Sequence, residues 1–322
     1  MAAPRIAVAP GGARQWVCDA VRAGGAELVE PERAEGIVWT ETDRAADLKR
    51  LLDDVPGIRW VQLPWAGVEP FARAGVLDDR RLWTCGKGVY ARPVAEHALA
   101  LALAGLRNLK RFATSRSWDE QSGISLVGGK VTIFGGGGIC RELLRLLAPF
   151  DAEVTVVRRH PDARLDGKGG TPEGTQAPPL RGVQRVFGFG ERYEALRDAD
   201  VVFLALALTA ETAGLMGAIE FELMAPHAWL VNVARGEHVV TDELLVALQG
   251  DVIGGAALDV TDPEPLPEGH PLWSLPNCLI TPHTANTEDM AIPLLSERIA
   301  ENVRRFGAGE ELIGPVDAML GY

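Results

Sequence analysis

The sequence predicts an α/β protein of two domains, each built on a doubly wound parallel sheet of the Rossmann-like kind. Three observations support this fold class. The chain has 322 residues, which suits two domains, and 47% of them are apolar, which is enough for two cores. Short apolar runs alternate with helical patterns, as they do in parallel sheets. Near the middle of the chain, a run of glycines joins a strand pattern to a helical pattern.

The first third of the chain alternates short strands with helices. Strands are expected at residues 5–9, 36–39, 59–63 and 82–84, and helices near residues 13–22 and 44–52. A longer helix begins at Pro93, since proline suits a first helical turn. This helix is apolar almost all round, which predicts burial between two bodies.

A second α/β series follows this helix. Its strands are expected at residues 131–134, 153–157, 183–187, 201–205, 229–233, 252–257 and 278–281. A surface loop is expected at residues 161–180 and a last helix near residues 289–306. We therefore expect a dinucleotide-binding domain, residues 99–286, inserted into a discontinuous substrate-binding domain, residues 1–98 and 287–322. The active site is expected in the cleft between the two.

The run of glycines predicts a dinucleotide site. In a Gly-x-Gly-x-x-Gly motif between strand and helix, the first glycine permits a tight turn and the second lets the backbone approach a pyrophosphate. The start of the helix then holds the anion. A motif that starts at Gly135 has Gly137 second and Cys140 third, whereas one that starts at Gly136 has Arg141 third.

The motif that starts at Gly135 is favoured. The apolar strand ends just before it, and Cys140 is small enough for helix–strand packing, whereas an arginine is not. The expected cofactor contacts are then Gly135, Gly137, Gly138 and Ile139. A flexible glycine turn without a ligand is the alternative that the motif by itself leaves open.

The end of the next strand predicts which dinucleotide binds. NAD sites usually carry an acid there, about 20 residues beyond the glycines, which hydrogen-bonds the ribose 2′-OH. This chain has Arg158 and Arg159 instead. A guanidinium binds a 2′-phosphate but cannot accept a hydrogen bond from a hydroxyl. We therefore expect NADP(H), with NAD(H) as the alternative. Arginines that merely solvate the strand end would still leave no acid to select NAD.

Polar side chains follow three late strands. Arg235 comes directly after one strand, Glu264 lies in a proline-rich loop after the next, and His283 follows the last. In doubly wound sheets these strand ends face the ligand. Each residue alone is common at protein surfaces. Together they suit the reduction of a keto acid, because a cation holds the carboxylate and polarises the carbonyl while a histidine, kept protonated by a neighbouring carboxylate, delivers the proton.

Motifs over nearly the whole chain resemble the D-isomer-specific 2-hydroxyacid dehydrogenase family. The matching segments occur in order at residues 94–97, 135–140, 208–212, 231–236, 259–266 and 281–285. The resemblance implies that Arg235 grips the substrate's carboxylate and carbonyl, that His283 is the acid/base, and that Glu264 is its hydrogen-bonded partner. It also implies further cofactor contacts from Leu206, Thr212, Val233 and Asp259, the last near the nicotinamide.

The resemblance extends to the substrate loop and to the oligomeric state. Residues 64–68 match the family's loop whose backbone N–H groups bind the carboxylate, so Trp65, Ala66, Gly67 and Val68 are expected to contact the substrate. Family members are typically homodimers that associate through the nucleotide domain, partly through the helix that contains residues 94–97. A homodimer is therefore expected here.

Three positions distinguish this chain within the family pattern. Cys140 replaces the usual third glycine, and Ala207 replaces the proline usually found before Leu208. Neither change removes a catalytic group. Arg158 resembles the residue found in the NADPH-preferring glyoxylate/hydroxypyruvate reductases of this family.

Composition argues against several other classes of function. The net charge of −12 disfavours nucleic acid and anionic membranes as partners. Four cysteines are scattered without a C-x-x-C pair, which predicts free thiols in the cytoplasm and no metal site. No uninterrupted apolar run reaches the roughly 18 residues that a membrane span needs.

The sequence therefore predicts an NADPH-dependent reductase that converts a small 2-keto acid, such as glyoxylate or hydroxypyruvate, to the D-2-hydroxy acid. One alternative is an NAD-dependent dehydrogenase of another 2-hydroxy acid, such as phosphoglycerate. A more remote one is a dinucleotide-sensing interaction protein similar to corepressors. The intact set of Arg235, Glu264 and His283 favours catalysis. Trp65 and Tyr90 are candidates for narrowing the substrate pocket or for the domain core.

Overall fold

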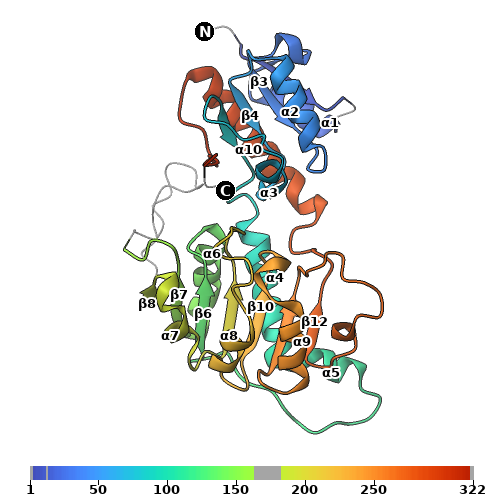
Figure 1. Cartoon of the computed structure of the whole chain (residues 1–322), viewed down its shortest axis with the longest axis vertical. Helices are drawn as coiled ribbons and strands as arrows, with labels where there is room; N and C mark the ends of the chain where they lie inside the picture. Colours follow the sequence, from blue (N-terminus) through green and yellow to red (C-terminus); the bar gives the residue numbers. More distant parts are fainter. Residues whose placement is uncertain (1–2, 12–13, 163–182, 320–322) are drawn as a thin grey trace. The chain divides into compact units, whose positions relative to one another are not determined.

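The computed structural model describes residues 3–11, 14–162 and 183–319. They form two compact units, each of which is treated by itself. The first contains the described residues up to Tyr90 and those from Thr287 onward, and the second contains those between Ala91 and Asn286. The first has a five-stranded parallel sheet and the second a seven-stranded parallel sheet (Figure 1). The predicted α/β class with two doubly wound parallel sheets is confirmed.

The sheet of the first unit has the strand order β2-β1-β3-β4-β5. Its strands are β1 (Arg5–Ala9), β2 (Glu27–Leu28), β3 (Gly36–Trp39), β4 (Trp60–Gln62) and β5 (Leu82–Thr84). Its helices are α1 (Gln15–Ala23), α2 (Ala45–Asp54), α3 (Glu69–Arg73) and α10 (Glu288–Ala308), with the 3-10 turn η1 (Pro31–Arg33). Apolar residues of α1 and α10 pack on one face of this sheet, and those of α2 and α3 pack on the other. The two-residue strand β2 was not predicted, because it is too short to show a strand pattern.

The sheet of the second unit has the strand order β12-β11-β10-β9-β6-β7-β8. Its strands are β6 (Lys130–Phe134), β7 (Glu153–Val157), β8 (Val183–Phe187), β9 (Val201–Leu204), β10 (Trp229–Asn232), β11 (Gly255–Leu258) and β12 (Cys278–Ile280). Its helices are α4 (Ala91–Leu106), α5 (Leu109–Thr114), α6 (Gly138–Leu147), α7 (Arg192–Leu196), α8 (Ala218–Leu223) and α9 (Thr241–Gln249). Its 3-10 turns are η2 (Ala148–Phe150), η3 (Phe189–Glu191), η4 (Gly236–His238) and η5 (Pro271–Trp273). Apolar residues of α7, α8 and α9 pack against the sheet and form a core there. Helix α4 packs on β10, β11 and α6.

The chain order of the larger sheet reverses at β6. This strand pairs with β7 on one side and with β9 on the other, so that Phe134 lies between Val157 and Leu204. In open α/β sheets, ligands bind beyond the carboxyl ends of the strands at such a switch point. A cofactor is therefore expected to bind at the residues that follow β6 and β9.

Helix α4 lies wholly within the second unit. The two units part between Tyr90 and Ala91, before the boundary after residue 98 that was expected from the sequence. One face of α4, which includes Val94, Ala98 and Leu101, is buried within the unit, whereas Ala100 on the other face is exposed. Its own unit thus covers one side of the helix, and the other side, which includes apolar residues, is only partly buried.

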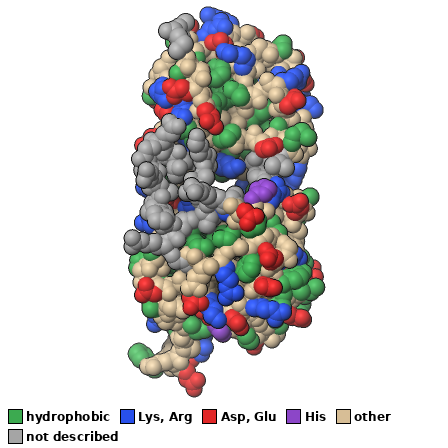
Figure 2. All heavy atoms as spheres, turned by 90° about the vertical axis from the view of Figure 1, so that its left-hand side faces the viewer, with side chains coloured by type: hydrophobic (Ala, Val, Ile, Leu, Met, Phe, Trp, Pro, Cys, Tyr) green, Lys and Arg blue, Asp and Glu red, His purple; other side chains and the backbone are tan. Residues whose placement is uncertain are grey.

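The loop predicted at residues 161–180 lies almost entirely outside the described residues. In the described part of the chain, no helix is both long and apolar enough to cross a membrane. Over the described part of the face shown in Figure 2, basic and acidic side chains are interspersed.

Candidate active site

Gly135 occupies the switch point, directly after β6. Its φ of +113° lies in a region that favours glycine, and its N–H donates to the carbonyl oxygen of Val157 at 2.8 Å. A Cβ at this position would lie 2.2 Å from the carbonyl oxygen of Ala205, the residue after β9. Gly135 therefore forms the tight turn that the first glycine of a dinucleotide motif requires.

The turn leads directly into α6. Gly137 precedes the helix in an extended conformation, and among the described residues no atom beyond its chain neighbours lies within 4 Å of a Cβ built on it. Gly138 and Ile139 open the helix, and Cys140 is completely buried. Burial raises the pKa of the Cys140 thiol to about 12. The helix thus packs inward through Cys140 while the backbone at Gly137 stays open to a ligand.

Arg158 and Arg159 follow β7. Nη2 of Arg158 donates to the carbonyl oxygen of Pro161 at 3.0 Å, whereas its buried Nε has no hydrogen-bond partner among the described residues. Nη2 of Arg159 lies 2.9 Å from Oε2 of Glu211, in the loop after β9. A buried donor without an acceptor is rare in folded proteins and indicates a place for one. The donors here fit an anion such as a 2′-phosphate.

The loop after β9 contains Leu206 and Thr212 and is held from within. The Thr212 hydroxyl accepts from the N–H of Thr209 at 2.8 Å and donates to the carbonyl oxygen of Ala207 at 2.8 Å. The ring of the fully buried His238 lies against the same loop, with Nδ1 2.9 Å from the oxygen of Thr212 and Nε2 3.3 Å from that of Leu206. Burial lowers the pKa of His238 below its ordinary value, which favours the neutral ring at neutral pH.

Arg235 lies at the end of β10, where a buried asparagine shapes the backbone. Nδ2 of Asn232 donates to the carbonyl oxygen of Arg235 at 2.8 Å, and its Oδ1 accepts from the N–H of Ala234 at 3.0 Å. Nη1 of Arg235 donates to the carbonyl oxygen of Ala234 at 2.7 Å. Val233, between them, is buried. The guanidinium of Arg235 therefore extends from the end of β10, which lies two strands from β6 and its glycine turn.

Glu264 and His283 meet beyond β11 and β12. Nδ1 of His283 lies 2.7 Å from Oε1 of Glu264, and the side chains are 52% and 43% exposed. His283 has a left-handed backbone with φ of +49°. Its backbone nitrogen lies 2.8 Å from the carbonyl oxygen of Asp259 and 3.0 Å from that of Thr281. A carboxylate that occupies Nδ1 leaves Nε2 of the ring to exchange a proton with a ligand.

A buried carboxylate organises the loop that carries the histidine. Asp259, 2% exposed, accepts from the Thr281 hydroxyl at 2.6 Å and from the N–H groups of Thr284 and Ala285 at 2.9 and 3.0 Å. Nε2 of His97 lies 3.3 Å from its Oδ1 and 3.1 Å from the Thr281 hydroxyl. Burial disfavours the charged form of Asp259, but these hydrogen bonds outweigh it and hold its pKa below the ordinary value.

Several of these supporting residues were not singled out by the sequence analysis. His97 and Asn232 lie in the matched segments 94–97 and 231–236 but were given no role, and His238, next to Glu237, was not mentioned. Apart from the matched segment, the signal for Asn232 was a polar side chain at the end of an otherwise apolar strand. The described residues contain no cluster of three or more His, Cys, Asp or Glu able to hold a metal ion.

The loop expected to bind the substrate follows β4 in the first unit. The carbonyl oxygen of Trp65 accepts from the N–H of Gly86 at 2.9 Å, and that of Ala66 lies 3.7 Å from Sγ of Cys85. Within the described part of the chain, the N–H groups of Ala66 and Gly67 have no protein acceptor. A loop with its carbonyls tied down and its N–H groups free is suited to an anion.

Two aromatic rings pack against each other at the start of this loop. The rings of Trp65 and Tyr90 pack with centroids 5.9 Å apart, and Tyr90 is only 8% exposed. Val68, at the end of the loop, is 2% exposed. Tyr90 is therefore largely buried and packs against the ring of Trp65.

The parallel sheet with a glycine turn at its switch point is that of a dinucleotide-binding domain. Residues 97–285 match the family described as D-isomer specific 2-hydroxyacid dehydrogenase, NAD binding domain. The chain belongs to this family, and the protein is an NAD(P)-dependent oxidoreductase.

Individual relatives agree with the family. The protein "Uncharacterized protein in proB 3′region" of Corynebacterium melassecola is 36% identical over 276 residues, 84% of this chain and 86% of that one. Glyoxylate/hydroxypyruvate reductase A of Photorhabdus laumondii subsp. laumondii is 30% identical over 285 residues, 84% of each chain. Among solved structures, the D-isomer specific 2-hydroxyacid dehydrogenase from Xanthobacter autotrophicus Py2, in complex with NADPH and MES, has a TM-score of 0.82 and 25% identity over 100% of both chains.

Proposed function

We propose that this protein reduces a small 2-keto acid, such as glyoxylate or hydroxypyruvate, to the D-2-hydroxy acid with NADPH. The observation that carries the proposal is the pair of Glu264 and His283, with 2.7 Å between Oε1 and Nδ1, at the strand ends of the dinucleotide-type sheet. A histidine held in this way presents Nε2 as a general acid. The relative from Photorhabdus, a glyoxylate/hydroxypyruvate reductase by name, supports the choice of substrate.

Each proposed role follows from the chemistry of one group. Nε2–H of His283 gives its proton to the carbonyl oxygen of the substrate, and the carboxylate of Glu264 stabilises the imidazolium that donates it. Arg235 binds the substrate's carboxylate and polarises the carbonyl. The free N–H groups in the loop of residues 65–68 add donors for the carboxylate. When bound, the dihydronicotinamide supplies a hydride to the carbonyl carbon.

NADPH is the proposed cofactor, with NADH as a poorer substitute. Its pyrophosphate would lie at the glycine turn, and its 2′-phosphate against Arg158 and Arg159. The unpaired Nε of Arg158 supports this, as does the NADPH in the complex of the Xanthobacter relative. The residues proposed to surround the cofactor are Gly135, Gly137, Gly138, Ile139, Leu206, Thr212, Val233 and Asp259. Thr212 and Asp259 would act chiefly through the loops that their hydrogen bonds hold.

A cytoplasmic homodimer is proposed as the working form. The outer side of α4 leaves Leu99 and Leu103 only half-buried, and Trp118 in the segment after α5 is 98% exposed. Apolar surface of this kind is typical of an interface. Light scattering should give twice the chain's 34.5 kDa. A monomeric mass would contradict the proposal.

The reaction is tested by initial rates of NADPH and NADH oxidation with glyoxylate, hydroxypyruvate, pyruvate, phenylpyruvate and phosphohydroxypyruvate. The proposal expects the fastest turnover with NADPH and one of the first two acids. A preference for NADH would overturn the cofactor assignment, and a preference for the phosphorylated acid would overturn the substrate assignment. Silence with every acid would favour a dinucleotide-sensing interaction protein instead.

His283→Asn tests the proton donor. The variant should lose at least about 10²-fold in kcat, because general acid catalysis contributes about that much. The matched control is His227→Asn. Nε2 of His227 lies 2.6 Å from Oδ1 of Asp200, at the opposite, amino-terminal ends of β9 and β10. Equal losses in the two variants would refute the assignment of His283.

A further inference from the structure

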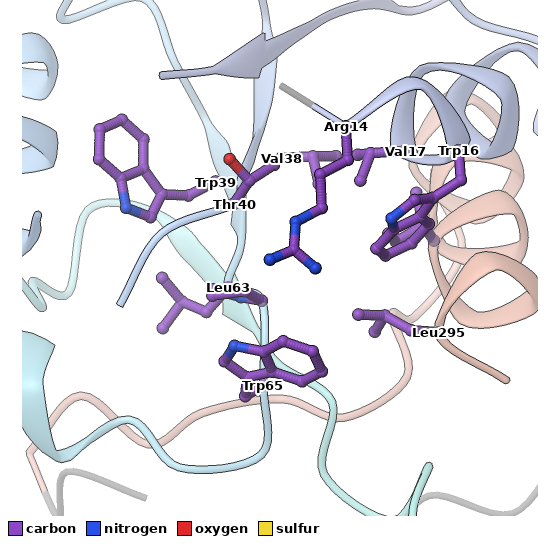
Figure 3. Close-up of a pocket in the computed structure, with 11 residues that line it drawn as sticks. Arg14, Trp16, Val17, Val38, Trp39, Thr40, Leu63, Trp65 and Leu295 are labelled. Carbon is purple, nitrogen blue, oxygen red and sulfur yellow. The ribbon is translucent and has the colours of Figure 1, made fainter. Parts of the chain in front are cut away.

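A small pocket lies in the first unit between the carboxyl ends of β3 and β4 and the helices α1 and α10 (Figure 3). Its walls are mostly apolar and include the indoles of Trp16, Trp39 and Trp65. Ligands of open α/β sheets bind at this end of the strands. Trp65 also belongs to the loop of residues 65–68, so the pocket adjoins the N–H groups proposed to bind the substrate's carboxylate.

Arg14 limits the size of the pocket. Figure 3 shows its side chain reaching into the middle, with Trp16 and Leu295 to one side and Trp65 below. Nη1 of Arg14 is paired with the carboxylate of Glu288, which favours this position of the guanidinium. The remaining cavity is about 10 Å³, which is room for about one water-sized group.

One wall of the pocket carries an unused hydrogen-bond donor. The indole Nε1 of Trp16 is buried and has no partner among the described residues. The indole of Trp39 in the same pocket differs, because its Nε1 donates to the carbonyl oxygen of Glu41 at 2.5 Å. A buried donor without a partner indicates a place for an acceptor supplied by a ligand.

We propose that this pocket binds the substituent on the keto carbon and that Trp16 selects a substrate whose substituent carries a hydroxyl group. The inference rests on the proposed function and concerns the substrate of that same reaction. The oxygen of a hydroxymethyl group accepts the Nε1–H of Trp16, and this hydroxyl is the water-sized group that enters the small space that Arg14 leaves. Glyoxylate has no substituent to satisfy the donor, and pyruvate brings a methyl group that cannot accept. A larger apolar substituent requires the displacement of Arg14.

Trp16→Phe tests the donor, because it removes the N–H and keeps most of the ring. The ratio of kcat/KM for hydroxypyruvate to that for glyoxylate should fall about three- to tenfold, the range for one neutral hydrogen bond. Trp83→Phe is the matched control, since its Nε1 donates to the carbonyl oxygen of Asp78 at 3.0 Å and Trp83 does not line the pocket. Its ratio should equal that of the unmodified protein. An unchanged ratio in Trp16→Phe, or an equal change in both variants, overturns the inference.

Arg14→Ala tests the size limit independently at a more exposed position. The ratio of kcat/KM for 2-ketobutyrate to that for glyoxylate should rise at least about fivefold, since about two methylene-sized groups of apolar contact become available. An unchanged or lower ratio overturns the assignment of the pocket. If the unmodified protein reduces none of these acids, the proposed function fails and this inference fails with it. If it reduces them and neither ratio moves, only the inference fails.

Discussion

Thr281→Val tests whether the buried cluster around Asp259 orders the loop that carries His283. The Thr281 hydroxyl donates to Oδ1 of Asp259 at 2.6 Å and lies 3.1 Å from Nε2 of His97. Valine keeps the shape of the side chain and removes the hydroxyl. Because Asp259 is 2% exposed, water does not readily replace the lost donor.

The expected size of the effect follows from this burial. A hydrogen bond to a charged group contributes about 1.5–3 kcal/mol, so the variant should lose about 2 kcal/mol of stability. For a unit of about 190 residues this lowers Tm by about 4–8 °C. The freed loop should also lower kcat about tenfold, because small displacements of a reacting group are costly. The KM for NADPH should change little, since the hydroxyl acts on the histidine loop.

The assay compares Thr281→Val with Thr281→Ser, which keeps the hydroxyl. Thermal unfolding is followed without cofactor at one pH, and kcat and KM are measured with glyoxylate. The serine variant should retain most of both Tm and kcat. Equal Tm values for the two variants would refute the energetic reasoning. A full kcat in a destabilised valine variant would refute the link between the Asp259 cluster and the position of His283.

Three further predictions concern the cofactor site. Gly135→Ala should lower Tm in the absence of cofactor, because the added Cβ would lie 2.2 Å from a backbone oxygen. Gly137→Ala should lower only the affinity for NADPH. Equal losses of Tm in the two variants would contradict this prediction. Arg158→Gln should raise the KM for NADPH about tenfold or more and change that for NADH less than about twofold, and an equal rise for both would count against the 2′-phosphate site. His238 has a pKa below its ordinary value of 6.5, so the folded state binds fewer protons and stability should fall as the pH drops below about 6.5. In His238→Asn, Tm should fall less between pH 7.5 and 5.5 than in the unmodified protein. An identical fall would show that His238 is not the source of this pH dependence.

Much of the fold and of the candidate site was readable from local patterns. Apart from β2, the parallel strands were predicted because most are short apolar runs between turns, and their predicted positions lie within a few residues of those observed. Gly135 was identifiable because a run of glycines between strand and helix is itself a local signal. Arg235, Glu264 and His283 were found because each follows a strand, and strand ends share one edge of a parallel sheet. Their roles, like the cytoplasmic homodimer, stay predictions.

Local patterns could not indicate groups that meet only after folding. His97 approaches Asp259 because α4 packs across β11 and β12, and no local pattern of the chain records that contact. Likewise, Trp16 and Trp65 line one pocket because α1 lies over the carboxyl ends of the strands in the first unit. Whether a donor such as Nε1 of Trp16 has a partner depends on the positions of distant atoms. Sequence periodicity therefore sufficed for the sheets and the strand-end residues, whereas burial and the pairing of polar atoms were set by the packing of segments far apart in the chain.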